Sequence, residues 1–156
     1  MLYRKRAWDI MRSEFAVVDH EATLAQVIQA MKGSLESAPD NNCVLVTSRQ
    51  EGFVGVISMW NIIKAMGPGL LKKAAQGSHE ENYENSFKLA CQLGAQAGIK
   101  KIIQKDVPRI SPNETLARIM EVFLDYRQGR LVVEEGGKVM GLVMVADLYR
   151  EIASCI

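Results

Sequence analysis

The stretches GVISMWN (Gly55 to Asn61) and GLVMVAD (Gly141 to Asp147) decide how this chain folds. Each begins with a glycine and two apolar residues and ends with a side chain that can accept hydrogen bonds, Asn61 or Asp147. In both, a strand-like apolar run passes directly into the start of a helical pattern. Recurrence of this kind indicates an internal repeat, which has to be identified before the fold is inferred.

A second pair of matching stretches lies upstream of the first. Thr23-Leu24-Ala25 recurs as Thr115-Leu116-Ala117, an offset of 92 positions. A short β-branched stretch precedes each threonine, at residues 15–22 and 107–114, and predicts a strand that runs into a helix start. The apolar residues that follow fall at helical spacing and predict an amphipathic helix in each copy: Leu24, Val27, Ile28 and Met31, then Leu116, Ile119, Met120, Phe123 and Leu124.

Each copy continues with two strands joined by a short turn and closes with a second helix. The segments are 43–47, 53–57 and 59–66 in the first copy and 130–135, 139–143 and 145–153 in the second. The sequence therefore predicts an α+β protein built from two strand-helix-strand-strand-helix units. The glycines are offset by only 86 positions, so the first copy has six extra residues, which we place in a loop at residues 32–42.

The region between the copies is longer than an ordinary connection. We expect a first repeat at residues 7–66, a helical insertion at 67–100 and a second repeat at 101–156. Gly67-Pro68-Gly69 predicts a helix break, and the apolar spacing from Tyr83 onward predicts an inserted helix over residues 80–97. This helix is expected to cover exposed core; the alternative is an arm that binds a partner or forms a dimer.

Composition excludes several classes of function. Nineteen Lys plus Arg against eighteen Asp plus Glu give a net charge of +1, which does not indicate binding to nucleic acid or to a membrane surface. No run approaches the roughly 18 apolar residues of a membrane span, and no signal-peptide pattern is present, so we expect a cytoplasmic protein. Three distant cysteines and two histidines form no metal-ligand spacing, and no catalytic motif can be found. We therefore expect no enzyme, no metal and no required cofactor.

On these residues the chain resembles a tandem pair of cystathionine-β-synthase (CBS) domains, a Bateman module. That family has the pattern Gly-apolar-apolar-Ser/Thr-x-x-Asp, which stands here as Gly55 to Asn61 and Gly141 to Asp147. Its leading strand, with a proline shortly after the last branched residue, is similar to residues 107–112. The resemblance covers about 120 of the 156 residues and leaves the central insertion outside it.

The resemblance implies two pseudo-twofold related units whose sheets pack together, with two clefts between them. In many members these clefts bind AMP, ADP, ATP or S-adenosylmethionine. Such modules usually sense a ligand rather than catalyse, and two pairs commonly associate into a flat disk. We accordingly expect an adenosyl ligand, a homodimer and an effector protein that the sequence does not identify.

The residues suit such a ligand chemically. A helix that begins directly after a strand presents unpaired N–H groups, so Ser58 or the backbone around Met59 can hold a phosphate. Asp147, one turn into its helix, can accept hydrogen bonds from both ribose hydroxyls. Glycine at positions 55 and 141 lets a ligand or a neighbouring backbone come close. By the family arrangement, the walls for a purine would come from Phe15, Val17, Val107, Pro108 and Ile110.

The two copies depart from the pattern in complementary ways. The first keeps Ser58 but has Asn61 in place of the acid, so its ribose bonds would lack charge. The second keeps Asp147 but has Met144 in place of the hydroxyl residue. Either this site prefers adenosine or a sulfonium ligand, or a cation such as Arg109, Arg130 or Arg150 binds the phosphate there. We therefore expect one occupied cleft rather than two, and the sequence does not decide which of the two it is.

Two alternatives stay open. Ser58, Asn61 and Asp147 are also ordinary helix-capping residues that need no ligand. The module would then be a structural homodimerisation unit with degenerate, empty clefts. Failure of every adenosyl ligand to bind a dimeric protein would favour that reading.

Overall fold

The computed structural model describes residues 4–76 and 80–156, with the side chains of 74–76 and 80–83 excepted. The chain divides into two compact units. Unit 1 contains the residues through Phe15, Gln50–Phe53 and Lys105–Ile156; unit 2 contains Ala16–Arg49 and Val54–Gln104. Each unit is described by itself.

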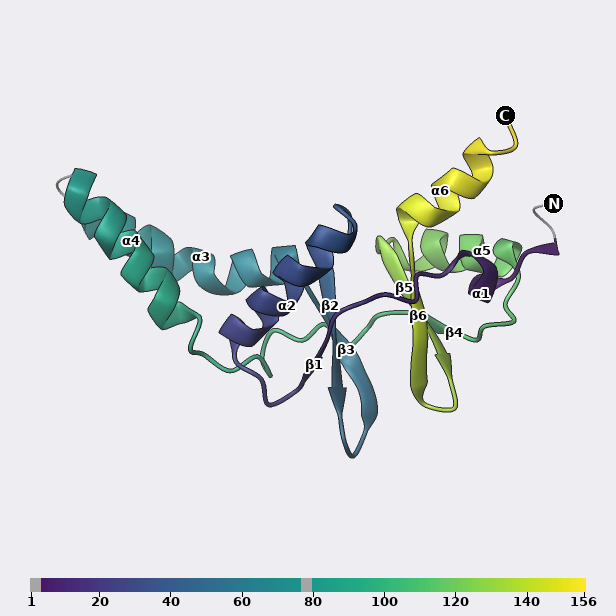
Figure 1. The fold of residues 1–156 in the computed structure, drawn as a ribbon, viewed down its shortest axis with the longest axis horizontal. Helices are drawn as coiled ribbons and strands as arrows, with labels where there is room; N and C mark the ends of the chain where they lie inside the picture. The colour runs from purple at the N-terminus through teal and green to yellow at the C-terminus, as the bar shows by residue number, and fades with distance from the viewer. Residues whose placement is uncertain (1–3, 77–79) are drawn as a thin grey trace. The chain divides into compact units, whose positions relative to one another are not determined.

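Unit 2 holds the strands and helices of the first repeat and of the insertion (Figure 1). Its elements are β1 (Val17–Asp19), α2 (Leu24–Ser37), β2 (Cys43–Ser48), β3 (Gly52–Ser58, except for Gly52 and Phe53, which belong to unit 1), α3 (Met59–Gln76) and α4 (Glu80–Gly94). The sheet order is β1-β2-β3, with β1 parallel to β2 and Val17 opposite Leu45. The core is the apolar face of α2 against the sheet and one later residue: Leu24, Val27, Met31, Val44, Val46, Ile57 and Ile99.

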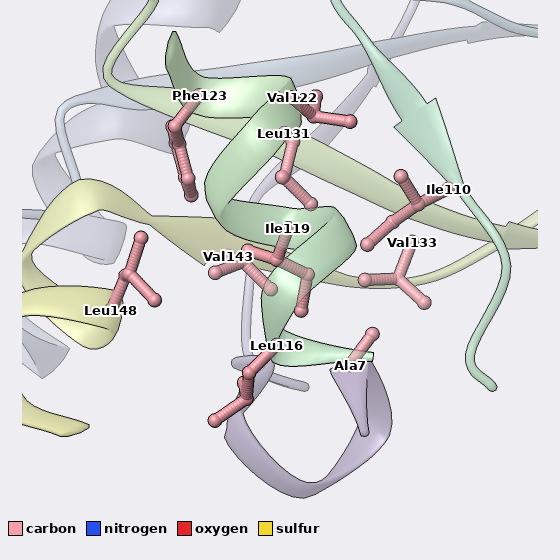
Figure 2. Close-up of a cluster of buried hydrophobic side chains, with 10 residues drawn as sticks. All are labelled: Ala7, Ile110, Leu116, Ile119, Val122, Phe123, Leu131, Val133, Val143 and Leu148. Carbon is pink, nitrogen blue, oxygen red and sulfur yellow. The ribbon is translucent and has the colours of Figure 1, made fainter. Parts of the chain in front are cut away.

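Unit 1 repeats the same order with β4 (Arg109–Ile110), α5 (Leu116–Tyr126), β5 (Arg130–Glu135), β6 (Lys138–Met144) and α6 (Val145–Ala153), preceded by the one-turn helix α1 (Ala7–Ile10). The sheet order is β4-β5-β6, with β4 parallel and β6 antiparallel to β5. Figure 2 shows the core, in which Ile119 of α5 lies among Leu131, Val143 and other buried apolar side chains. The two matching sheets confirm the predicted α+β fold with two repeated units.

The repeated Thr-Leu-Ala stretches mark helix starts. Thr23 Oγ1 accepts a hydrogen bond from Gln26 N at 3.3 Å, and Gln26 Oε1 accepts one from Thr23 N at 2.9 Å. Thr115 Oγ1 accepts from Arg118 N at 3.1 Å at the start of α5. In each helix the threonine satisfies a backbone donor that has no partner within the helix, and this fixes the first residue of both α2 and α5.

Two expectations about loops are wrong. Residues 32–37, expected in a loop, extend α2, which has 14 residues where α5 has 11. The predicted break at Gly67-Pro68-Gly69 is absent, because α3 continues through Pro68 to Gln76. Proline removes the bond to the carbonyl four residues earlier, on Lys64. Lys64, Pro68 and Gly69 are all exposed, so water can bond to that carbonyl and the helix tolerates the proline.

The predicted inserted helix is present as α4, which ends at Gly94 rather than at Ala97. It lies alongside α3 (Figure 1). Between α2, α3 and α4 is a cavity of about 460 Å³ with mainly apolar walls, among them Ile28, Ile62, Met66, Leu70 and Cys91.

The segment that leads into each repeat packs in the unit of the other repeat. Ala7 is fully buried in the core of unit 1, where the backbone of Arg12 pairs with Leu142 of β6. Ile99 is fully buried in the core of unit 2, where the backbone of Gln104 pairs with Val56 of β3. Each sheet therefore has an extra backbone partner on its third strand, supplied by the segment that leads into the other repeat.

Candidate functional site

Asp147 lies in the first turn of α6, immediately after β6. Its Oδ2 accepts a hydrogen bond from Met144 N at 2.8 Å, so the carboxylate closes the N-terminus of the helix. A negative charge at this position also complements the positive end of the helix dipole. The side chain is only 10% exposed, so the charge is held at a defined place between the strand and the helix.

Two arginines bind the same carboxylate. Arg12 donates from Nε to Oδ1 at 3.1 Å and to Oδ2 at 2.9 Å, and from Nη2 to Oδ1 at 2.9 Å. Arg150 Nη1 donates to Oδ1 at 3.0 Å from one turn further along α6. The Arg12 side chain is 15% exposed whereas that of Arg150 is 64% exposed, so the Arg12 bonds are the better protected from solvent.

The backbone of Arg12 is fixed as well as its side chain. Arg12 N donates to Leu142 O at 2.7 Å, and Leu142 N donates to Arg12 O at 3.0 Å. A Cβ at Gly141 would lie 2.6 Å from Arg12 O, so only glycine lets the two backbones approach this closely. Gly141 therefore positions Arg12, and Arg12 in turn holds the carboxylate of Asp147.

The corresponding part of the first repeat has the same architecture without the charges. Ser58 is 5% exposed, and its N and Oγ donate to Asn61 Oδ1 at 2.8 and 2.9 Å. Asn61 N donates back to Ser58 Oγ at 3.1 Å, which completes a reciprocal cap of α3. A Cβ at Gly55 would overlap the carbonyl oxygen of Gln104, so this glycine accommodates the backbone of Gln104.

Unit 1 contains most of the residues proposed from the sequence. Met144 is buried at the end of β6 and lies opposite Arg130 of β5 in the register. Val107 and Pro108 are buried, and Ile110 belongs to the core cluster of unit 1. Phe15, partly buried, is also in unit 1. Four proposed residues lie in unit 2: Ser58, Asn61, Gly55 and Val17, of which Val17 is 47% exposed.

The phosphate-binding cations considered from the sequence are engaged in different ways. Arg109 Nη1 lies 3.1 Å from Glu134 Oε2, so it is paired with a carboxylate of β5. Arg150 is paired with Asp147, as described above. Arg12 was missed from the sequence because 135 positions separate it from Asp147. The one available signal was that Arg12 and Gln104 stand 92 positions apart, the same offset as the two Thr-Leu-Ala stretches.

The site can therefore offer a partly buried carboxylate to hydroxyl groups and two guanidinium groups to an anion. In the part of the chain that the structure describes, no three His, Cys, Asp or Glu side chains are grouped so as to hold a metal ion. Within the same described residues, no helix has both the length and the apolar character needed to cross a membrane.

Comparison with known proteins gives the family. The sequence model described as the CBS domain matches residues 7–68 and 99–154. No curated protein matches the chain.

Solved structures with the same fold include the CBS domain of a CBS-domain-containing membrane protein from Sphaerobacter thermophilus, with 17% identity, TM-score 0.75, and coverage of 96% of this chain and 88% of that one. CBSX2 in complex with AMP has 14% identity and TM-score 0.64, covering 97% and 98% of the two chains. The cytosolic domain of the Mg²⁺ channel MgtE in complex with ATP has 16% identity and TM-score 0.67, covering 94% and 48%.

The family match extends over both repeats, and its boundaries include the two glycine heptapeptides and the two capping threonines. The chain belongs to the CBS domain family and carries two CBS domains.

Proposed function

We propose that this protein is a regulatory CBS pair that binds an adenosine-containing ligand, AMP, ADP, ATP or S-adenosylmethionine, and signals its presence to a protein partner. The observation that carries the proposal is the carboxylate of Asp147, only 10% exposed, at the β6–α6 junction and at the acid position of the family pattern. The nucleotides named in the AMP and ATP complexes of CBSX2 and MgtE support the choice of ligand class. CBS domains are in general regulatory rather than catalytic, and we propose no enzymatic activity.

We propose that the ligand binds at the second repeat. Asp147 would accept hydrogen bonds from the ribose hydroxyls, and Met144 and Arg130 would contact the same ligand at the end of the β5–β6 pair. At the first repeat, Ser58 and Asn61 are bonded to each other and carry no charge, so they would compete less well for a ligand. Binding would change the signal only in so far as the ligand has different affinities for two conformations of the module.

We also propose a homodimer that acts in the cytoplasm. Large apolar side chains are exposed on the helices that end each repeat, including Trp60 at 63%, Ile63 at 54% and Tyr149 at 67%. Apolar surface of this kind suits contact with a second copy. Among the described residues, Cys43, Cys91 and Cys155 form no disulfide, as in proteins of reducing compartments.

The second candidate function is a structural homodimer without a ligand. One observation favours it: the two oxygens of Asp147 already accept five hydrogen bonds, from Arg12, Arg150 and Met144. In this reading Asp147 only closes α6 and anchors the leading segment, and the exposed helices carry the function.

Calorimetric titration with AMP, ADP, ATP and S-adenosylmethionine separates the two. We expect binding of about one ligand per chain, weakened about 10- to 150-fold in Asp147→Ala, because hydrogen bonds to a charged group contribute about 1.5–3 kcal/mol. Asp125→Ala removes an exposed carboxylate of α5 and serves as the matched control, with unchanged affinity. Asp147→Asn keeps an oxygen that can accept the hydrogen bond of the helix cap. If this variant is folded but binds the ligand weakly, the lost binding in Asp147→Ala does not result from loss of the fold. A dimeric wild type that binds none of the four ligands would instead support the structural candidate.

A further inference from the structure

We propose that the cavity between α2, α3 and α4 binds an amphipathic carboxylate of the fatty-acid class, with its hydrocarbon chain against the apolar walls and its carboxylate at Lys32. This is a second ligand site, distinct from the proposed nucleotide site, because the residues that line the cavity belong to unit 2, whereas Asp147 belongs to unit 1. It goes beyond the proposed function and does not depend on it.

The cavity forms where the helical insertion packs against the first repeat. The family model matches residues 7–68 and 99–154, so α4 and the last part of α3 lie outside both matches. Part of the cavity wall comes from this unmatched region, through Leu70, Cys91 and Ala95, and another part comes from α2. The cavity is therefore a feature of the insertion and not of the pattern that the two repeats share.

The walls of the cavity are mainly apolar. Ile62, Met66 and Leu70 stand four residues apart in α3 and so lie on one face of that helix. The volume of about 460 Å³ falls within the roughly 300–1,000 Å³ of small-molecule sites. Ile63 also lines the cavity and is 54% exposed, so the cavity is open to solvent. Such a site takes up hydrocarbon through the burial of apolar surface.

A single positive charge stands at the edge of the cavity. Lys32 is the one charged side chain among the described residues that line it, and it is exposed. It follows Ile28 by one turn of α2, so its hydrocarbon stem can lie along the apolar wall while the ammonium group stays in water. Within the part of the chain that the structure describes, the Lys32 side chain has no ion pair or hydrogen bond, so an incoming anion displaces no internal partner.

These features select one class of ligand. A nucleotide would remove the donors and acceptors of its base and sugar from water and meet mainly apolar walls in return, which is unfavourable. A cationic amphiphile would bring a like charge to Lys32. A carboxylate with a hydrocarbon chain matches both parts of the site, because the chain enters the cavity while the head group stays in water beside Lys32.

The test is a calorimetric titration with decanoate, octanoate and decan-1-ol as probes. Octanoate should bind about 15-fold more weakly than decanoate, because each buried methylene contributes about 4-fold in affinity. Lys32→Gln should weaken decanoate binding about 2- to 5-fold, as expected for an exposed ion pair, and should leave decan-1-ol binding unchanged. Salt should reduce the effect on decanoate. Lys64→Gln removes an exposed lysine of α3 outside the cavity lining and is the matched control, with wild-type affinity for every probe.

Two further measurements locate the bound probe. Ala95→Leu places a larger side chain in the cavity and should weaken binding of every probe about 10-fold or more. Its control is Ala97→Leu, at an exposed position outside the lining, which should bind the probes as wild type does. In a Cys155→Ser protein, in which Cys43 is buried, decanoate should slow the reaction of Cys91 with iodoacetamide as the cavity fills.

Several outcomes would overturn the inference. It is wrong if the wild type binds no decanoate, if Ala95→Leu binds decanoate as the wild type does, or if Lys32→Gln affects decanoate and decan-1-ol equally. It is also wrong if Ala95→Leu changes the oligomeric state and not decanoate binding, because a second copy of the chain then covers the cavity. Lys32→Gln replaces an exposed side chain and still decides the question if Ala95→Leu does not fold. Binding of the adenosine ligands is tested separately with Asp147→Ala, so the two proposals can fail independently.

Discussion

Replacing Gly55 by alanine should destabilise unit 2, because the backbone of Gln104 occupies the space that a side chain would need. Val56 N donates to Gln104 O at 3.0 Å, and Gln104 N donates to Val56 O at 2.8 Å. A Cβ on Gly55 would overlap that same Gln104 oxygen and would lie 2.7 Å from Cγ2 of Ile103. Because the main obstacle is backbone rather than the end of a flexible side chain, a rotamer change cannot relieve it.

The magnitude follows from the contacts. Forcing an extra carbon into a packed site typically costs 1–3 kcal/mol. Weakening the two backbone hydrogen bonds adds about 0.5–1.5 kcal/mol for each. The free energy of unfolding should therefore fall by about 2–6 kcal/mol, a large part of the roughly 5–15 kcal/mol that stabilises a typical domain.

Urea denaturation followed by circular dichroism measures this change. Gly33→Ala is the matched control: Gly33 lies inside α2 and nothing lies within 4 Å of the added carbon, so this variant should gain about 0.5–1 kcal/mol from lower chain entropy and better helix propensity. A Gly55→Ala protein within about 0.5 kcal/mol of wild type would refute the argument that this glycine exists for the close backbone approach.

Two further perturbations test the cap and the charges of unit 2. Ser58→Ala should lower the free energy of unfolding by about 0.5–2 kcal/mol, because Asn61 loses its buried hydrogen-bond partner. Ser58→Thr keeps a hydroxyl and should retain most of that stability. An equal loss in both variants, measured by thermal denaturation, would contradict a capping role. Hydrogen bonding from Lys100, and then its charge, lowers the pKa of Glu21 below its ordinary value of 4.5. This pair therefore stabilises the protein above the unfolded-state pKa, and the contribution is lost as the pH falls through the folded-state value. In Lys100→Ala the pKa of Glu21 should return toward 4.5, and an NMR titration of the Glu21 carboxyl that is the same in both proteins would count against the contact.

The sequence predicted the order of elements well because each helix and strand is specified locally. Thr23 and Thr115 cap their helices in the structure as their positions indicate, and both glycine heptapeptides end a strand and begin a helix. The break at Pro68 was predicted wrongly because helix propensity describes an isolated helix. Propensity alone does not show that the carbonyl of Lys64, which loses its hydrogen bond to the proline, would face solvent.

The candidate site was less predictable, because its contacts join distant positions. A periodic pattern tells which face of a helix is buried but not which segment covers it. Arg12 could therefore not be assigned to Asp147, nor could Gln104 be assigned to the strand that contains Gly55. From the sequence, Gly55 and Gly141 could have made room for either a ligand or a neighbouring backbone. In the structure a neighbouring backbone lies against each of them, that of Gln104 at Gly55 and that of Arg12 at Gly141.

Because each leading segment packs in the unit of the other repeat, the two units can complete their folding at different times during synthesis on the ribosome. Nearly all of unit 2 is contiguous and is complete once Gln104 has emerged, so it can fold while the remainder is being made. Ala7 and Arg12 cannot make their native contacts in unit 1 until Leu142 and Asp147 have been synthesised. These residues follow Gln104 by roughly 40 positions, which is about 2–8 s at ordinary elongation rates. During that interval the apolar segment around Ala7 has no native partner, although unit 2, which follows it in the sequence, can already be folded. Slow codons or a chaperone that protects this segment would thus affect unit 1, and with it the carboxylate of Asp147, far more than unit 2.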